Sequence, residues 1–183
     1  MVHYFNPKDS YALSGFCKVF GELLQRKAGS CHIVLVCIGS DRATGDCLGP
    51  IIGHKLKRFE DNFSVYGTLE KPVHAKNLGD ALCFIKRYHP DSLVIAIDAS
   101  LGTQEHIGFI TLGEGCLYPG VGVEKDLPDV GDIFITGIVN QAGGNGHMLL
   151  QTTHLNTVMK LADFICSGLY YCLKHRSAIQ CTK

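Results

Sequence analysis

Apolar positions along the chain follow two kinds of spacing, one typical of helices and one typical of buried strands. Apolar residues three or four apart mark three predicted helices, at 10–27, 77–88 and 148–173. Near-continuous apolar runs mark two core strands of the kind that helices cover on both faces, at 31–38 and 93–97. Weaker patterns indicate three more strands, at 64–69, 108–112 and 132–139, and one more helix, from 50 to 59.

This alternation of strands and helices predicts the fold class. We expect a three-layer α/β/α sandwich with a mostly parallel central sheet of about five strands, a phosphorylase/hydrolase-like fold. No repeat, low-complexity tract or linker interrupts the chain, so residues 1–183 are predicted to form a single domain. The predicted inward face of the last helix consists of Leu155, Met159, Ala162, Ile165 and Leu169. The loop predicted over 113–131 is long for a compact domain, and loops of that length tend to be functional or mobile.

Composition and charge narrow the classes of partner. Hydrophobic residues make up 46% of the chain, charged residues 19%, and the formal net charge is zero. This balance excludes a disordered chain and gives no electrostatic reason to expect nucleic acid or a membrane surface as partner. No apolar run approaches the roughly 20 residues needed to span a bilayer, and the first residues do not resemble a signal peptide. We therefore expect a cytoplasmic protein, and the sequence leaves a homo-oligomer open.

The nine cysteines are numerous for a chain of this size. They form no C-x-x-C pair, and five lie within apolar segments: Cys17, Cys37, Cys83, Cys166 and Cys172. Buried free cysteines behave as small apolar residues, and a reducing compartment keeps them as thiols. We interpret them as packed thiols, with a metal or redox role as the alternative.

Two acidic residues stand where chemistry is expected in an α/β fold. Asp46 and Asp98 each follow an apolar run and lie in a turn that contains glycine. In open α/β sheets, ligands bind outside the carboxyl ends of the strands, and neighbouring strands are about 5 Å apart. Two carboxylates at these ends could share one crevice, which suits acid–base chemistry or a metal ion.

Structural roles compete with this interpretation. Asp46 could cap the helix that follows, but Pro50 favours a helix start at Gly49-Pro50, which leaves Asp46 in the loop. Asp98 could form an Asx-turn, although a carboxylate at the end of so apolar a strand is costly unless it is paired or bonded. Asp41 and Arg42 could form a local ion pair or contact a substrate.

Other chemical motifs are weak. Three of the nine histidines are the candidates for a metal: His74, His147 and His154. Two carboxylates and one histidine would suit a divalent transition ion, but no ligand spacing of a known type is present, so no cofactor is predicted. The chain has neither a G-x-S-x-G elbow nor a nucleotide-binding glycine motif, although the stretch 143–146 could hold an anion.

Three stretches carry a resemblance to a known family. Residues 38–50 read Ile-Gly-Ser-Asp-Arg-Ala-Thr-Gly-Asp-Cys-Leu-Gly-Pro, and residues 66–69 and 72–78 read Tyr-Gly-Thr-Leu and Pro-Val-His-Ala-Lys-Asn-Leu. They resemble the YyaC family of sporulation proteins, which is considered related to the protease that degrades small acid-soluble spore proteins during germination. The resemblance covers about residues 31–163. It implies a peptidase-like protein of spore formation or germination.

The same resemblance implies roles for particular residues. The germination protease has a proposed catalytic pair of aspartates, one in an Asp-x-Leu-Gly-Pro stretch and one in an Ile-Asp-Ala-Leu stretch, and Asp46 and Asp98 match them. Its Pro-Gly-x-Gly-Val segment resembles the loop with Pro119, Gly120, Gly122 and Val123, which are predicted to bind substrate together with Asp41 and Arg42. The next residues, 124–128, depart from its pattern. Hydrogenase-maturation endopeptidases resemble the chain more distantly, and in that family paired acids and a histidine bind a metal.

The sequence therefore predicts a hydrolase that cleaves a peptide or small protein with Asp46 and Asp98 as an acid–base pair. Two alternatives stay open. The first is a catalytically inactive protein of the same fold that binds a peptide or partner, because residues 124–128 depart from the protease pattern. The second is a metal-dependent endopeptidase of the maturation type.

Overall fold

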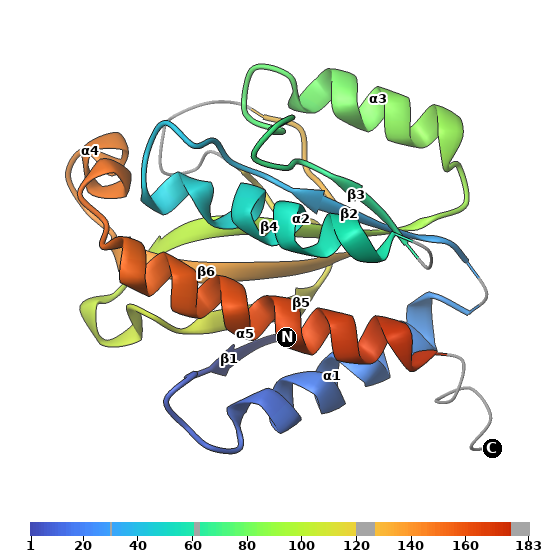
Figure 1. The fold of residues 1–183 in the computed structure, drawn as a ribbon, viewed down its shortest axis with the longest axis horizontal. Coiled ribbons are helices and arrows are strands. Elements are labelled where there is room, and N and C mark those ends of the chain that lie inside the picture. Colours follow the sequence, from blue (N-terminus) through green and yellow to red (C-terminus); the bar gives the residue numbers. More distant parts are fainter. Residues whose placement is uncertain (30, 61–62, 120–126, 177–183) are drawn as a thin grey trace.

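A six-stranded sheet runs through the computed structural model of the chain, which describes residues 1–29, 31–60, 63–119 and 127–176 (Figure 1). The strands, in chain order, are β1 (Val2–Phe5), β2 (Ile33–Cys37), β3 (Ser64–Tyr66), β4 (Leu93–Gly102), β5 (Ile110–Glu114) and β6 (Ile133–Gln141). The α-helices are α1 (Ala12–Lys27), α2 (Leu48–Leu56), α3 (Leu78–Tyr88), α4 (Gly146–Gln151) and α5 (Leu155–Lys174). Three short 3-10 helices are η1 (Gly45–Cys47), η2 (Lys57–Phe59) and η3 (Gln104–His106).

The sheet is mixed, with a parallel centre. Its strand order is β1-β5-β6-β4-β2-β3, in which the pairs β3–β2, β2–β4 and β4–β6 are parallel. The pairs β6–β5 and β5–β1 at one side are antiparallel. This architecture confirms the predicted α/β fold with a mostly parallel sheet.

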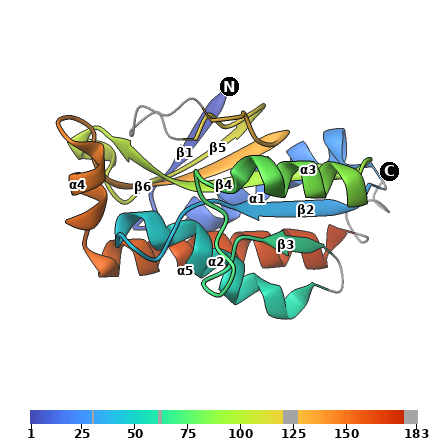
Figure 2. The ribbon, with the colours of Figure 1, turned by 90° about the horizontal axis from the view of Figure 1, so that it is seen from above.

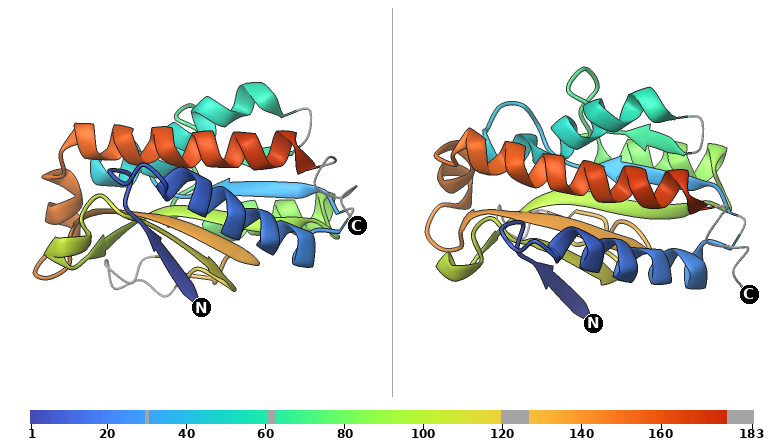
Figure 3. Two further views of the ribbon diagram at one scale, coloured as in Figure 1. Left: turned by 90° about the horizontal axis from the view of Figure 1, so that it is seen from below. Right: turned by 60° about the horizontal axis from the view of Figure 1, so that its bottom comes forward.

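Helices cover the two faces of the sheet unequally. Figure 3 shows α1 and α5 across one face, and a core around Phe16, Leu48 and Ile165 packs there together with α2. Figure 2 shows α3 over the opposite face, where Leu78 and Ile85 pack against alternate residues of β2. Successive side chains of a strand point to opposite faces, so each helical layer contacts every second residue of β2 and β4.

Close backbone contacts hold α2 on the end of β2. A Cβ atom at Gly49 would overlap the carbonyl oxygen of Ile38, which directly follows β2. Glycine is therefore required at this position for the first turn of α2 to approach the strand. The contact fixes the connection between β2 and α2, which carries Asp46.

The sheet has one strand more than the sequence predicted. Strand β1 is an edge strand of only four residues, antiparallel to β5, and we expected no strand there. Strand β4 also continues to Gly102 instead of ending at Ile97. Asp98 consequently lies inside β4 and does not close it.

The helix predicted over 148–173 is in fact two helices. The carbonyl of Leu149 accepts hydrogen bonds from the side chains of Thr152, Thr153 and Asn140, at 3.3, 2.9 and 2.8 Å. In a continuous helix a backbone N–H group would bind this carbonyl, and here the side chains bind it instead. The backbone of His154 is extended, and α5 begins directly after it. Leu155, predicted to face inward, is 55% exposed because it begins the second helix.

Cysteine burial agrees only in part with the prediction. Cys37, Cys47 and Cys172 are buried, Cys17 and Cys166 are half-buried, and every cysteine in the described ranges is a free thiol. Cys83, which we expected to be packed, is exposed on α3. No helix in the described part of the chain is long and apolar enough to cross a membrane.

Candidate active site

Asp46 lies in η1, on the connection between β2 and α2. The chain keeps backbone hydrogen bonds to neighbouring segments after β2 ends. The N–H of Ile38 donates to the carbonyl of Ile97 at 2.7 Å, and the N–H of Gly39 donates to the carbonyl of Val73 at 2.8 Å. The N-cap of α2 is Cys47, and no side chain caps this helix. The capping role considered for Asp46 is therefore wrong, and its carboxylate instead accepts hydrogen bonds from Ser40.

Asp98 lies in the middle of the sheet, on β4. It is 9% exposed, and its Oδ1 atom accepts the N–H of Ala99 at 2.7 Å. Side chains alternate along the strand, so Asp98 points to the same face as Ala96, which packs in the cluster under α3. The turn predicted for Asp98 does not form, because the strand continues through this residue.

The structure brings the two carboxylates into electrostatic contact. Burial raises the pKa of Asp98 well above its ordinary range, and the negative charge of Asp46 raises it further, against a smaller opposite effect of the Ala99 N–H. The interaction follows from the sheet, since β2 ends with Cys37 paired to Ile97 of β4, so the connection that carries Asp46 starts next to Asp98.

The surroundings of Asp46 differ from those of Asp98. Burial raises the pKa of Asp46 as well, but the hydrogen bonds from Ser40 and the charges of His74 and His147 lower it. Burial therefore raises the pKa of both carboxyl groups, and the pKa of the enclosed Asp98 is raised further than that of Asp46. Pairs of carboxyl groups in unlike surroundings are typical of acid–base catalysis.

The charges of two of the three predicted histidines, His74 and His147, lower the pKa of Asp46. His74 follows Val73, which pairs with Ile38, and the backbone N–H of His74 donates to Asn77 Oδ1 at the start of α3, at 2.8 Å. His147 is in the first turn of α4, where its N–H donates to Asn145 Oδ1 at 3.1 Å. His154 is the N-cap of α5, and its side chain is exposed.

The arrangement does not fit a metal centre. Within the described ranges, no three His, Cys, Asp or Glu side chains are grouped so that they could hold a metal ion. Asp98 points to the side of the sheet under α3. No step of the chemistry discussed below is assigned to a metal.

The predicted substrate-binding residues are only partly described. Asp41 and Arg42 are exposed on the connection before η1, and neither takes part in the four ion pairs that the described residues form. Pro119 is buried, while Gly120, Gly122 and Val123 lie outside the described residues. Their binding role stays a prediction.

Sequence reasoning missed Ser40, whose hydrogen bonds to Asp46 favour the ionised carboxylate. The only signal for it was its place directly after Gly39, in the turn that precedes Asp46.

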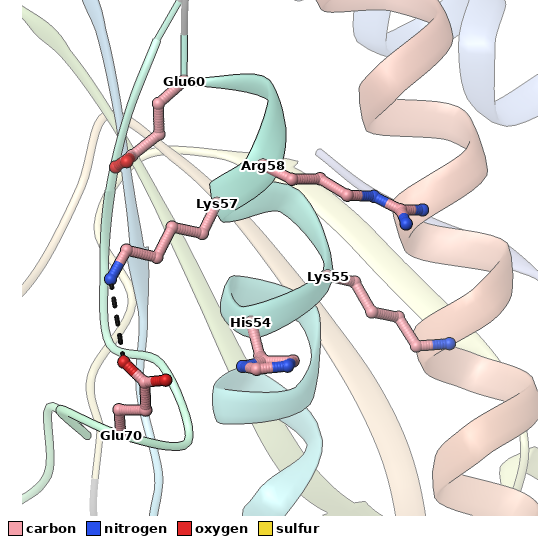
Figure 4. A pocket seen from close by; sticks show the side chains of 6 residues that line it. All are labelled: His54, Lys55, Lys57, Arg58, Glu60 and Glu70. Carbon is pink, nitrogen blue, oxygen red and sulfur yellow. Dashed lines mark ion pairs between the residues drawn. The ribbon is translucent and has the colours of Figure 1, made fainter.

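Sequence reasoning also missed a cavity of about 660 Å³ at the other end of α2 (Figure 4). There Lys57 points to Glu70, Lys55 pairs with Asp163 of α5, and Glu60 accepts the N–H of Val65 at 3.0 Å. These contacts hold α2 and η2 in place, and we assign no activity to the cavity.

Comparisons with known proteins show the family and the fold of the chain. Residues 4–168 match the family described as "Protein of unknown function (DUF1256)". The chain is 46% identical to "Uncharacterized protein YyaC" of Bacillus subtilis over 167 residues, which cover 91% of this chain and 81% of that protein. Among solved structures it is similar to the [NiFe] hydrogenase maturation protease HycI of Thermococcus kodakarensis, with a TM-score of 0.55 and 19% identity. That alignment covers 85% of this chain and 99% of HycI, and it shows a shared fold.

Proposed function

The chain belongs to the DUF1256 family of proteins of unknown function, and we propose that it is a peptidase whose acid–base pair is Asp46 and Asp98. One observation carries the proposal: the half-buried carboxyl of Asp46, on the connection after β2, interacts with the buried carboxyl of Asp98 on the neighbouring strand β4, and the pKa of Asp98 is raised further than that of Asp46. The fold adds support, because the HycI protein that shares it is a maturation protease.

The two environments assign the roles. Asp46 is the general base, because burial raises its pKa less than that of Asp98, with hydrogen bonds from Ser40 and the charges of His74 and His147 opposing the effect of burial. It takes a proton from a water molecule as that water attacks the scissile carbonyl. Asp98 is the general acid, because its enclosed carboxyl keeps a proton that it can donate to the leaving amine. Such proton transfers typically accelerate a reaction by on the order of 10²–10⁴-fold.

The substrate in this proposal is a peptide or small protein. Asp41 and Arg42 are exposed beside the pair and are suitably placed to contact an extended chain. The resemblance of residues 38–50 and of Asp98 to the germination protease favours a substrate that is present during spore formation or germination, in the cytoplasm of the sporulating cell or the spore.

Mass spectrometry of peptide mixtures tests the proposal. Purified wild-type protein, Asp98→Asn and the control Asp91→Asn are incubated with peptides from a spore extract, with and without chelator. Asp91 is a suitable control because it is exposed on the turn before β4, at the opposite end of the same strand. We expect new termini with the wild type and the control, unaffected by chelator, and none with Asp98→Asn.

Three outcomes would contradict the proposal. A folded Asp98→Asn variant that produces the same termini would remove Asp98 from the chemistry. Cleavage that is lost with chelator and restored by zinc or nickel would indicate a metal-dependent endopeptidase. A peptide that is retained at micromolar affinity but never cleaved would indicate a binding protein.

A further inference from the structure

Strand β4 continues past the end of its neighbour β2. The last residue pair between the two strands is Cys37 with Ile97, whereas β4 runs on to Gly102 and stays paired with β6 along this extension. Figure 2 shows β4 extending beyond the arrowhead of β2. Within the described ranges, residues 98–102 therefore have a partner strand on one side only, although β4 is a central strand elsewhere.

A glycine takes the chain out of the sheet at the end of β2. Ile38 makes one more hydrogen bond to β4, from its N–H to the carbonyl of Ile97. The next residue, Gly39, has a φ of +134°, which residues with a side chain rarely adopt, and a Cβ atom there would overlap the carbonyl oxygen of Asp46. The pairing therefore ends before Ala99, and the same bend places Gly39 against the backbone of Asp46.

The main-chain groups of Ala99 and Leu101 point to the side that β2 has left. Successive residues of a strand direct their N–H and C=O groups to opposite neighbours in the sheet. The carbonyl of Ile97 accepts a hydrogen bond from the β2 side, and the carbonyl of Gly102 accepts one from the residue that follows β6. Odd-numbered residues of β4 thus face the β2 side, so residues 99–101 form an open edge there.

Two main-chain groups of the open edge are available to a ligand. The N–H of Ala99 donates to Asp98 Oδ1 at 2.7 Å, so a carboxyl oxygen takes the place of the carbonyl that a neighbouring strand would offer. Among the residues that the structure describes, none hydrogen-bonds to the carbonyl of Ala99 or to the N–H of Leu101 on this side. Both residues are half-buried, so solvent reaches them. Main-chain groups are ordinarily paired, and an extended peptide offers the matching N–H and C=O.

We propose that the open edge binds the substrate as an added strand, which continues the line of β2 beside the acid pair. This inference rests on the proposed peptidase function and deepens it, because it gives the class of ligand: an extended peptide segment recognised through its main chain. One peptide residue donates its N–H to the carbonyl of Ala99 and accepts the N–H of Leu101. Because Asp98 directly precedes the open edge and Asp46 lies at the bend, the bound chain passes next to both carboxyl groups.

Main-chain recognition makes a specific demand on the ligand. The peptide residue that faces Ala99 needs a free N–H, so proline or an N-methylated residue cannot take this position. Many side chains are tolerated, because the affinity of an added strand comes from its main-chain hydrogen bonds. The outermost strands β1 and β3 also present edges, and they serve as internal controls because they lie at the two sides of the sheet.

Amide NMR of ¹⁵N-labelled full-length wild-type protein tests the inference without any need for cleavage. The probe is a synthetic hexapeptide of alternating threonine and valine, and its control is the same peptide with all six backbone nitrogens methylated. We expect the probe to shift the Leu101 amide signal and to slow its hydrogen exchange by on the order of tenfold or more, and the control to do neither. Equal effects of probe and control, no response at Leu101 at millimolar probe, or responses confined to β1 and β3 would overturn the inference.

Leu101→Pro and Leu101→Ala form a matched pair of variants. Leu101 packs against the main core, and both substitutions remove most of its side chain. Proline also removes the N–H, which points to the open side, so no hydrogen bond to β6 is lost. We expect the alanine variant to bind the probe like the wild type and the proline variant to bind it about tenfold more weakly. Equal affinities of the two folded variants would overturn the inference, and the methylated peptide decides if the proline variant does not fold.

Failure of this inference differs from failure of the proposed function. Cleavage of peptides by the wild type without a response at Leu101 would overturn the binding mode and leave the peptidase in place. A response at Leu101 in a protein that cleaves no peptide would support the open edge as a binding site and refute the peptidase.

Discussion

Replacement of Asp98 by asparagine should remove a loss of stability that the wild-type protein suffers as pH rises. Asp98 is 9% exposed, and burial followed by the charge of Asp46 raises its pKa well above the ordinary range. In the unfolded chain this carboxyl has an ordinary pKa of about 3.9. The folded state therefore binds the proton more tightly, so the stabilising effect is complete below the unfolded pKa and is lost as pH rises towards the folded pKa. Each pH unit in that window costs about 1.4 kcal/mol for one proton.

The asparagine side chain retains the main local contact. Its Oδ1 atom can accept the Ala99 N–H that Asp98 accepts at 2.7 Å, so the substitution removes the titration without leaving this donor unpaired. The stability difference between variant and wild type should therefore grow with pH above about pH 5, by up to about 1.4 kcal/mol per pH unit for each proton.

Urea unfolding at several pH values measures this difference. The free energy of unfolding is determined for the wild type, Asp98→Asn and Asp91→Asn between about pH 5 and pH 8. Asp91 is exposed on the turn before β4, so its variant should follow the wild-type curve. Parallel curves for the wild type and Asp98→Asn would show that Asp98 titrates as an ordinary carboxyl, and the acid role proposed for it would then fail.

Two further predictions concern packing and thiol chemistry. Gly49→Ala should destabilise the protein by about 1–3 kcal/mol, because the new Cβ overlaps the Ile38 carbonyl. Gly21→Ala in α1 should stabilise the protein by about 0.5–1 kcal/mol, because a Cβ there has no heavy atom within 4 Å. Urea unfolding decides this, and equal stabilities would contradict the close contact of α2 with β2. Burial raises the pKa of the Cys172 thiol to about 12, so iodoacetamide at about pH 8 should label exposed Cys83 and spare Cys172. Peptide mass spectrometry gives the labelled fractions, and equal labelling would contradict the burial of Cys172.

The layers of the fold could be predicted because their signals are local. Strand β2 and the first half of β4 are covered on both faces, so every position at 33–37 and 93–97 is apolar, and this pattern is visible in the sequence alone. The proximity of Asp46 and Asp98 followed from the same pattern, because parallel strands place their carboxyl ends together. In contrast, β1 is a four-residue edge strand whose pairing with β5 depends on a segment about 100 residues away.

The missed details depend on contacts between distant residues. The break between α4 and α5 depends on Asn140 of β6, which no periodicity within 148–173 can reveal. The continuation of β4 through Asp98 similarly depends on its pairing with β6, where Asp98 lies opposite Thr136. The sequence could place the two carboxyl groups near each other, but the difference between their pKa values arises from burial, which acts more strongly on Asp98, and from the groups that the fold places around Asp46.

The measurement that tests the acid pair most directly is a single-turnover comparison on a peptide that the wild-type protein cleaves. Rates are compared for the wild type, Asp46→Asn, Asp98→Asn and the double variant, after each is shown to be folded. We predict that each single substitution slows cleavage by on the order of 10²–10⁴-fold or more, and that the double variant is no slower than the slower single one, because the two groups act as a unit. Multiplicative losses in the double variant, or a folded single variant that cleaves at the wild-type rate, would contradict the account.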